Sequence, residues 1–253
     1  MGRFDLKART IHFHRQFTDK RIAVTSLRRL YLRHGVRRKK VRKEKVMPQR
    51  LKERYTEQCC AVLAKINEEK ASGRKIIYCD EIVFSKVALQ TKEWSAKNTN
   101  LTVDQEDVYR GFRTVIASMS EEAGFGLLHV NTEITNQDNF QDFLKDLRRT
   151  NKKTPLALFL DQLSVHKTKK LRELMQSLNI NPIFNVGYSP EFNPIESVFS
   201  KVKFLFARTR LSNLVNKKGF NFDRSVELAF KAVTAAHCAA CVRKSKFLLE
   251  RAA

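Results

Sequence analysis

The chain has 253 residues, and 42% of them are hydrophobic, which is enough for one medium domain with a proper core, alone or with a small appendage. This composition excludes collagen-like, disordered and disulfide-scaffold proteins. The 49 Lys and Arg residues exceed the 26 Asp and Glu residues by 23, and the excess predicts a polyanionic partner.

The positive charge is concentrated near the N-terminus. Residues 1–54 hold 19 Lys and Arg against 4 Asp and Glu, a net charge of +15, and the remaining +8 is spread over the rest of the chain. Clustered cations favour nucleic acid because they release counterions from its phosphates. The distribution predicts a basic DNA-binding arm and linker over 1–48 and a globular domain over 49–253. A basic surface that only keeps the protein in solution is the alternative.

The cysteines and the apolar runs bear on the compartment. No apolar run approaches the roughly 18–20 residues that span a bilayer, so we expect a soluble, intracellular chain without a membrane partner. Five cysteines without framework spacing suit a reducing compartment. Cys238 and Cys241 form an isolated C-x-x-C in a helix-like stretch, which favours buried thiols over a zinc site with His237.

The first predicted element is a short helix in the arm. A hydroxyl N-cap from Thr25 or Ser26, apolar residues at 27, 30 and 31, and a final Gly35 predict it. Outside its apolar stripe lie three arginines, Arg28, Arg29 and Arg33. Two interpretations stay open: a recognition helix that enters a major groove, or an amphipathic helix with a solvated basic face.

A block of positive charge follows this helix. Its bases include Arg37, Arg38, Lys39, Lys40, Arg42 and Lys43. Such a block stays extended, and it predicts contacts with DNA phosphates, entry into a minor groove, or an import signal that would place the protein in the nucleus. A solvated linker without a partner is the plain alternative.

Beyond the arm, the pattern changes to alternating helices and strands. The predicted strands lie at 75–84, 109–119, 125–134, 155–160 and 182–186, and a turn at 120–124 joins the second to the third. The predicted helices lie at 49–72, 136–147, 167–178, from 194 onward and 222–250. Meandering strands followed by alternation predict an α/β fold, with a mixed five-stranded sheet that carries helices on both faces.

Two aspartates stand where acids are expensive. Asp80 follows the apolar run Ile-Ile-Tyr-Cys, and Asp161 ends the most apolar run of the chain. A carboxylate beside a buried strand is costly unless it is paired or binds a cation. These positions therefore indicate a functional role for both residues.

A third acid, Glu196, ends the segment Gly-Tyr-Ser-Pro-Glu-Phe-Asn-Pro-Ile-Glu. Asn193 suits an N-cap and Pro194 the first helical position, so Glu196 could complete a capping box. The two prolines also make the loop rigid, and a rigid loop that aims a carboxylate suits a metal site. Together the three acids are oxygen ligands of the kind that Mg²⁺ or Mn²⁺ prefers, and two such ions cleave phosphodiesters.

At these residues the sequence resembles the mariner superfamily of DNA transposases, cut-and-paste enzymes with a DDE triad on an RNase H-like fold. The resemblance covers roughly 20–210, and 34 residues separate Asp161 from Glu196, a spacing that this family uses. Trp94 and the helix before Asp161 also match the family pattern. The motifs that carry the resemblance are Ile77–Glu81, Leu158–Asp161 with His166, and Tyr188–Glu196.

The resemblance implies that Asp80 and Asp161 meet at the centre of the sheet, that Glu196 enters from the following helix, and that the three hold two ions. It also implies transposon ends and target DNA as partners, a homodimer on DNA, and a basic helix-turn-helix arm. The run Leu163–Lys167 and the C-terminal cysteines resemble, more narrowly, the transposases of ciliate telomere-bearing elements.

The sequence departs from the family pattern at two places. Gln162 and Leu163 follow Asp161 where the family has Asn-Ala, and only one helix-turn-helix unit, around 22–36, is visible where the family has two. Two other hypotheses stay open: a transposase-derived DNA-binding protein that has lost catalysis, and a ribonuclease H or structure-specific nuclease with the same fold.

Overall fold

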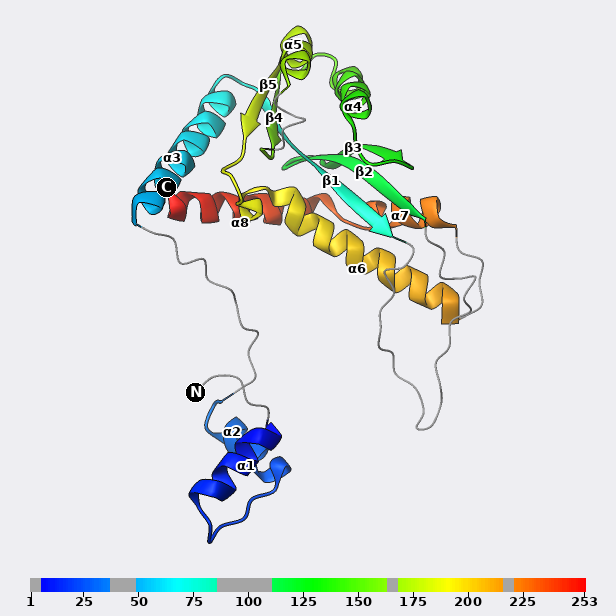
Figure 1. Ribbon diagram of the computed structural model, residues 1–253. Coiled ribbons are helices and arrows are strands. Elements are labelled where there is room, and N and C mark those ends of the chain that lie inside the picture. Colours follow the sequence, from blue (N-terminus) through cyan, green and yellow to red (C-terminus); the bar gives the residue numbers. More distant parts are fainter. Residues whose placement is uncertain (1–5, 37–48, 86–110, 163–167, 216–220) are drawn as a thin grey trace. The chain divides into compact units, whose positions relative to one another are not determined.

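The computed structural model describes residues 6–36, 49–85, 111–162, 168–215 and 221–253 (Figure 1). The chain divides into two compact units, residues 1–47 and 48–253. The assignment of these parts as a DNA-binding arm and a catalytic domain stays a prediction. Trp94, the basic residues 37–43 and the run Leu163–Lys167 lie outside the described residues.

The first unit contains helices α1, Leu6–Gln16, and α2, Val24–Arg33. Helix α1 was missing from the sequence-based prediction. Leu27 is buried in this unit, and the Arg9 guanidinium lies 5.7 Å from the centre of the Tyr31 ring and donates to its hydroxyl oxygen at 3.5 Å. The arm therefore holds a pair of packed helices rather than a single one.

The ends of α2 test the capping signals. The predicted hydroxyl cap is wrong: the helix begins earlier, after Ala23, so that Thr25 and Ser26 fall within its first turn. The predicted stop at Gly35 is confirmed, because Gly35 has φ +70° and the next amide, that of Val36, donates to the carbonyl of Tyr31.

The second unit is built on a five-stranded sheet, as predicted. The strand order is β3-β2-β1-β4-β5, in which β1 pairs antiparallel with β2 and parallel with β4. The remaining pairs are antiparallel β2 with β3 and parallel β4 with β5. The strands are β1 Lys75–Ser85, β2 Phe112–Ser120, β3 Gly124–Asn131, β4 Leu156–Leu160 and β5 Ile180–Phe184.

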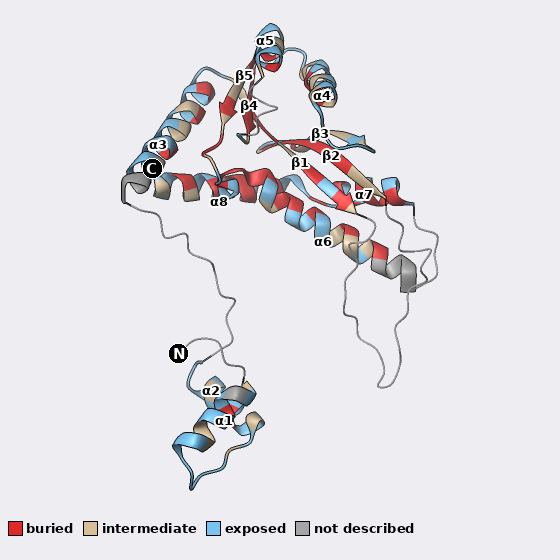
Figure 2. Cartoon of the chain, viewed as in Figure 1, coloured by how far each residue is buried: buried red, intermediate tan, exposed pale blue. Residues whose placement is uncertain are grey.

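Helices cover both faces of the sheet (Figure 1). Helices α4, Gln137–Thr150, and α5, Lys169–Ser177, pack on one face. The other face carries α3 Gln49–Ala71, α6 Pro194–Val215, α7 Phe222–Lys231 and α8 Ala235–Ala252. Figure 2 shows the strands between these helices mostly in the colour of buried residues.

Alternation along β1 divides its side chains between the two faces. Ile77 and Cys79 pack with the α4 and α5 side, and Ile76, Tyr78 and Ile82 pack with the α6 and α8 side. The predicted end of α3 is confirmed by Gly73 with φ +75°. The predicted cap of α4 is also confirmed, because Asn136 Oδ1 accepts from the backbone amides of residues 138 and 139.

The predicted last helix over 222–250 is wrong as a single element. It is two helices, α7 and α8, that meet at a bend of 70°. Thr234 begins α8 as its N-cap, since its hydroxyl oxygen accepts from the His237 amide at 3.2 Å. The bend lets Val226 and Cys241, on different helices, reach the same core.

The start of α8 approaches the sheet closely at Gly124, the first residue of β3. A Cβ atom there would lie 2.9 Å from the Ala235 Cα atom, and Gly124 also has φ +72°. Both conditions favour glycine. Within the described residues, no single helix is long and apolar enough to cross a membrane; α7 and α8 meet the test only as a bent pair.

Candidate active site

Neighbouring parallel strands position the two aspartates. The register of β1 and β4 pairs Lys75 with Leu156 and Tyr78 with Phe159. When this register is continued by two residues, Asp80 lies opposite Asp161. Because Tyr78 and Phe159 both face the α6 side of the sheet, alternation turns the two aspartates to that same side.

Asp80 is buried within electrostatic range of three other carboxylates. Its Oδ1 accepts from the Glu81 backbone amide at 2.8 Å. Burial raises the pKa of Asp80 to about 8, and the negative charges of Glu81, Glu196 and Asp161 add to this shift. The structure therefore brings the three predicted acids within electrostatic range of one another.

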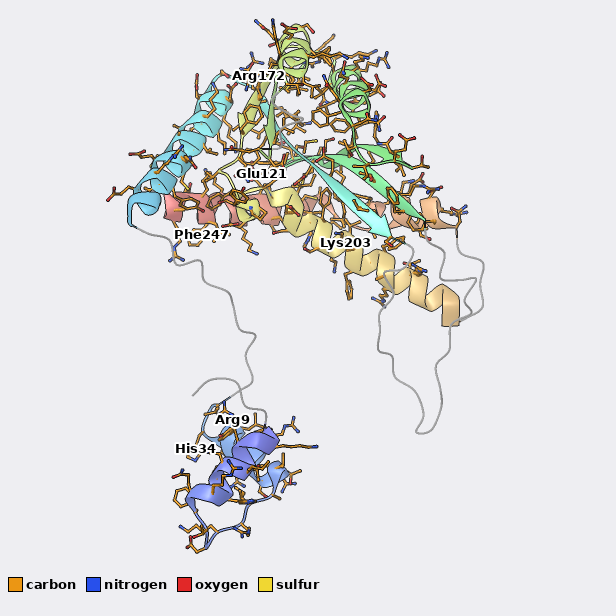
Figure 3. All side chains as sticks on the ribbon, viewed as in Figure 1. Arg9, His34, Glu121, Arg172, Lys203 and Phe247 are labelled. Carbon is orange, nitrogen blue, oxygen red and sulfur yellow. The ribbon has the colours of Figure 1, made fainter. Side chains whose placement is uncertain are left out.

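Glu196 lies in the first turn of α6. The predicted place of Pro194 as the first helical residue is confirmed. Desolvation raises the pKa of Glu196, the charge of Asp161 raises it further, and Lys203 on the same helix opposes the shift (Figure 3). The helix dipole ordinarily stabilises an ionised carboxylate at the start of a helix and so lowers its pKa. The raised pKa of Glu196 therefore shows that burial and the charge of Asp161 outweigh the dipole.

Asn193 does not form the capping box that the sequence left open. Its side chain is 1% exposed, and its Nδ2 donates to the Cys79 carbonyl oxygen at 3.3 Å and to Asp80 Oδ2 at 3.2 Å. Within the described part of the chain, the buried Asn193 Oδ1 accepts no hydrogen bond. A buried, unpaired amide oxygen costs about 1–3 kcal/mol, and a cap would have avoided that cost.

The loop before Asn193 is held from several sides. Gln162 Nε2 donates to the Asn185 carbonyl oxygen at 2.7 Å, and Asn185 Nδ2 donates to the Ser189 carbonyl oxygen at 2.8 Å. From α3, the Tyr55 hydroxyl lies 3.1 Å from Ser189 Oγ. Gln162, which departs from the family pattern, thus links the end of β4 to the loop that leads into α6.

One residue of this loop is strained and open to solvent. Tyr188 has φ +55°, a conformation that a bulky side chain rarely adopts, and its side chain is 93% exposed. Among the described residues, sequence reasoning missed Tyr55, Glu81 and Lys203 as neighbours of the site. The spacing of Lys203, two helical turns after Glu196, was the one available signal.

The donor chemistry of the three acids fits a hard divalent cation, because carboxylate oxygens are its preferred ligands and no positive charge is among the causes of the Asp80 pKa shift. Among the described residues, no three His, Cys, Asp or Glu side chains converge closely enough to hold an ion by themselves. Metal sites with few carboxylates are completed by water and substrate phosphate oxygens.

The predicted DNA-binding residues divide into two sets. Arg28, Arg29 and Arg33 are exposed on α2. The other six, at 37–40, 42 and 43, lie outside the described residues.

Cys238 and Cys241 are buried, burial raises the pKa of Cys238 to about 11, and Cys241 Sγ lies 3.8 Å from His237 Nε2.

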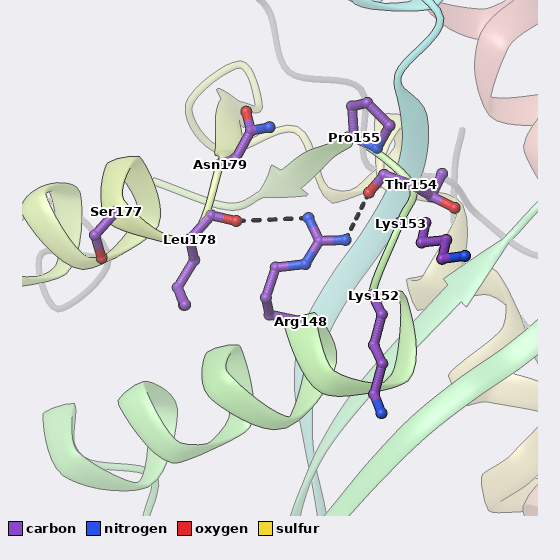
Figure 4. A pocket seen from close by; sticks show the side chains of 8 residues that line it. All are labelled: Arg148, Lys152, Lys153, Thr154, Pro155, Ser177, Leu178 and Asn179. Atoms are coloured by element: carbon purple, nitrogen blue, oxygen red, sulfur yellow. Dashed lines mark hydrogen bonds between the residues drawn. The ribbon is translucent and has the colours of Figure 1, made fainter.

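A cavity of about 260 Å³ lies at the other end of β4, among Arg148, Lys152 and Asn179 (Figure 4). Arg148 already donates to the carbonyl oxygens of Thr154 at 2.7 Å and of Leu178 at 3.5 Å. Its guanidinium thus ties the ends of α4 and α5 to the sheet. This cavity is distinct from the acidic cluster.

The strand order is that of an RNase H-like domain. Its acidic site consists of Asp80 on β1, Asp161 after the end of β4 and Glu196 at the start of α6. The chain belongs to the DDE superfamily endonucleases, since the sequence model of that family matches residues 75–215, which include all three acids. No curated protein sequence matches the chain.

Solved structures of Mos1 mariner transposase share the fold. A Mos1 paired-end complex with the left transposon end is 14% identical over 100% of this chain and 78% of that one, with a TM-score of 0.67. A Mos1 paired-end complex with Mn gives 15% identity, the same coverage and the same score. The Mos1 catalytic domain with Raltegravir and Mn gives 13% identity over 83% and 96%, with a TM-score of 0.55. The predicted RNase H-like fold is confirmed; the ciliate resemblance stays a prediction.

Proposed function

We propose that the chain is a mariner-type DNA transposase that cuts and joins DNA strands with Asp80, Asp161 and Glu196. The observation that carries this proposal is the position of the three carboxylates, which two neighbouring strands and one helix start supply: the charges of Glu196 and Asp161 both raise the pKa of Asp80, and the charge of Asp161 raises the pKa of Glu196. Stability alone gives no reason to gather three acids, because their repulsion opposes folding. Membership of the DDE superfamily endonucleases supports the same role.

Two Mg²⁺ or Mn²⁺ ions are the proposed cofactors, and similar Mos1 structures contain Mn or Mg. When bound, such ions activate the attacking hydroxyl and stabilise the leaving oxygen of the phosphodiester. Asp80 and Asp161 would hold them from adjacent strands, and Glu196 would complete the second site. Because strands and a helix start carry these groups, the protein supplies a rigid frame for the reacting phosphate.

The proposed partner is double-stranded DNA, as transposon ends and as target. The similar Mos1 structures include a complex with a transposon end, which supports this assignment. The exposed arginines of α2 and the basic residues 37–43 would hold the DNA backbone. A homodimer on DNA and a nuclear location complete the proposal, since two ends must be cut together and the basic block suits nuclear import.

The test is cleavage of plasmid DNA that carries the genomic sequence bordering the reading frame. We expect strand cleavage at the borders with Mg²⁺ or Mn²⁺ and none with EDTA. An RNA–DNA hybrid of the same sequence should stay intact. Cleavage of the hybrid in preference to the duplex would instead identify a ribonuclease, and DNA binding without any cleavage would identify a transposase-derived binding protein.

A further inference from the structure

Asn193 joins the elements that carry the first and the third acid. It precedes α6 by one residue and Glu196 by three, and its side chain reaches back to β1. There its Nδ2 lies 3.3 Å from the Cys79 carbonyl oxygen and 3.2 Å from Asp80 Oδ2. The Asn193 amide therefore ties the start of α6, which carries Glu196, to β1, which carries Asp80.

The chemistry around this amide fixes its orientation. The Cys79 carbonyl oxygen can only accept, and Asp80 Oδ2 accepts in the ionised form that would bind a metal. A flipped amide would turn its oxygen toward these two oxygens, which is repulsive, so the NH₂ group must point at them. Asn193 is thus committed to Asp80 as a donor.

The hydrogen bonds leave Asp80 with one defined position. Oδ1 accepts from the Glu81 amide at 2.8 Å, and Oδ2 accepts from Asn193. Each oxygen takes one of these bonds and keeps a further lone pair. A carboxylate that is held at both oxygens and retains free lone pairs is pre-positioned as a metal ligand.

We propose that Asn193 is a positioning residue for the reaction: it holds the Asp80 carboxylate in its metal-binding orientation and sets its separation from Glu196. This inference rests on the proposed metal-dependent cleavage. It assigns a task to the residue that the sequence presented as a helix cap.

The same chain offers a matched control. Asn181, on β5, donates through Nδ2 to both carboxylate oxygens of Glu69 at 3.1 and 3.0 Å. This is also an amide bonded to a buried carboxylate, but Glu69 is neutralised by Lys65 and Arg74. N181L therefore removes the same kind of bond outside the acidic site.

The experiment measures Mn²⁺ binding to the full chain by the loss of the free-ion EPR signal, without DNA, together with thermal stability and the Mg²⁺ dependence of cleavage. N193L should weaken Mn²⁺ binding by about 10–100-fold and raise the Mg²⁺ concentration that gives half-maximal cleavage. N181L should lower the melting temperature and leave Mn²⁺ affinity unchanged. N193A, which removes the amide without adding a branched side chain, should reproduce the N193L shift if the leucine variant does not fold.

The possible results separate the two proposals. Wild-type Mn²⁺ affinity in folded N193L or N193A overturns the positioning role, as does an equal loss of affinity in N193L and N181L. A wild-type chain that binds Mn²⁺ but cuts no DNA overturns the proposed function alone. A wild-type chain that binds no Mn²⁺ overturns both.

Discussion

Two carboxylates of the second unit, Glu69 and Asp80, are each hydrogen-bonded by a side-chain amide, but the charges around them are opposite. Burial would raise the pKa of Glu69, but hydrogen bonds from Lys65 and Asn181 and the charges of Lys65 and Arg74 outweigh it, so the pKa is lowered. Asp80 has carboxylates as its charged neighbours, and its pKa is raised to about 8.

This difference separates an acid that supports the fold from an acid that works against it. Glu69 is ionised, forms ion pairs with Lys65 and Arg74, and is buried, with 2% of its surface exposed. Asp80 gains an ordering amide from Asn193 and no neutralising charge among the groups that shift its pKa. Carboxylates of the second kind cluster at functional sites, because a ligand must supply the missing charge.

The largest expected effect is on cleavage. D80A, D161A and E196A should each lower the rate of metal-dependent DNA cleavage on the order of 10³-fold or more, because each removes a group that acts in the transition state. DNA affinity should stay near the wild-type value in a filter-binding assay. E69Q is the matched control and should cleave at the wild-type rate where it is folded; a rate loss as large as that of D80A would abolish the distinction.

The next effect is on stability without metal. The pKa of Asp80 is near 4 in an unfolded chain and about 8 in the folded one, so the unfolded state ionises first as the pH rises. The free energy of unfolding of the wild type therefore falls as the pH rises between these two values. D80N should be more stable than wild type by a few kcal/mol at about pH 9, and by little at about pH 4. Urea unfolding in EDTA measures it, and a D80N variant that is less stable at both values would contradict the carboxylate repulsion.

Glu69 should show the opposite sign. Its folded pKa is lowered, so its contribution is present above the unfolded pKa and is lost as the pH falls through the folded value. E69Q should cost about 1.5–3 kcal/mol near neutral pH, because it weakens hydrogen bonds to a charged group. The cost should shrink in acid. A cost that is constant from acid to neutral pH would show that the ion pairs of Glu69 do not stabilise the fold.

Substitutions in α2 should change DNA binding without changing metal binding at the acidic site. If Arg28, Arg29 and Arg33 contact phosphates, their replacement by Gln should lower the slope of log affinity against log salt by up to roughly 3. The intrinsic Mn²⁺ affinity of the acidic site should stay unchanged. An unaltered salt slope would mean that the basic face of α2 is only solvated.

The smallest expected effect is the loss of stability in a variant without the N-cap of α4, and it serves as a reference for the two pH-dependent predictions. N136A removes the cap of α4 and should cost about 1 kcal/mol at every pH between 5 and 9, since the lost bonds involve no titrating group. The same urea unfolding series measures it. A pH-dependent cost would show that the contrast between Glu69 and Asp80 is not specific to their charges.

Local signals in the sequence predicted most of the fold. The doubly buried run of β4, the glycine after α3 and the cap at Asn136 each act over a few residues, and the structure confirms them. The bend between α7 and α8 was missed because the apolar stripe continues across it, and the hydroxyl of Thr234 gives only a weak break signal.

The candidate site was predictable in part. Asp80 and Asp161 stood out because acids beside apolar runs are costly, and the strand register explains how they meet. Glu196 stood out because a rigid loop with two prolines precedes it. Asn193 was interpreted as a cap, since its spacing to Glu196 fits one. Its partners, at Cys79 and Asp80, lie more than a hundred residues away in the chain, and such a contact follows from tertiary packing alone.

The most direct test of the central claim is anomalous diffraction from crystals of the chain grown with Mn²⁺. We predict Mn²⁺ peaks within coordination distance of Asp80 and Asp161, with Glu196 beside the second ion, and none at Glu69. Absence of Mn²⁺ at the three acids in a protein that still cleaves DNA with Mn²⁺ would contradict the account.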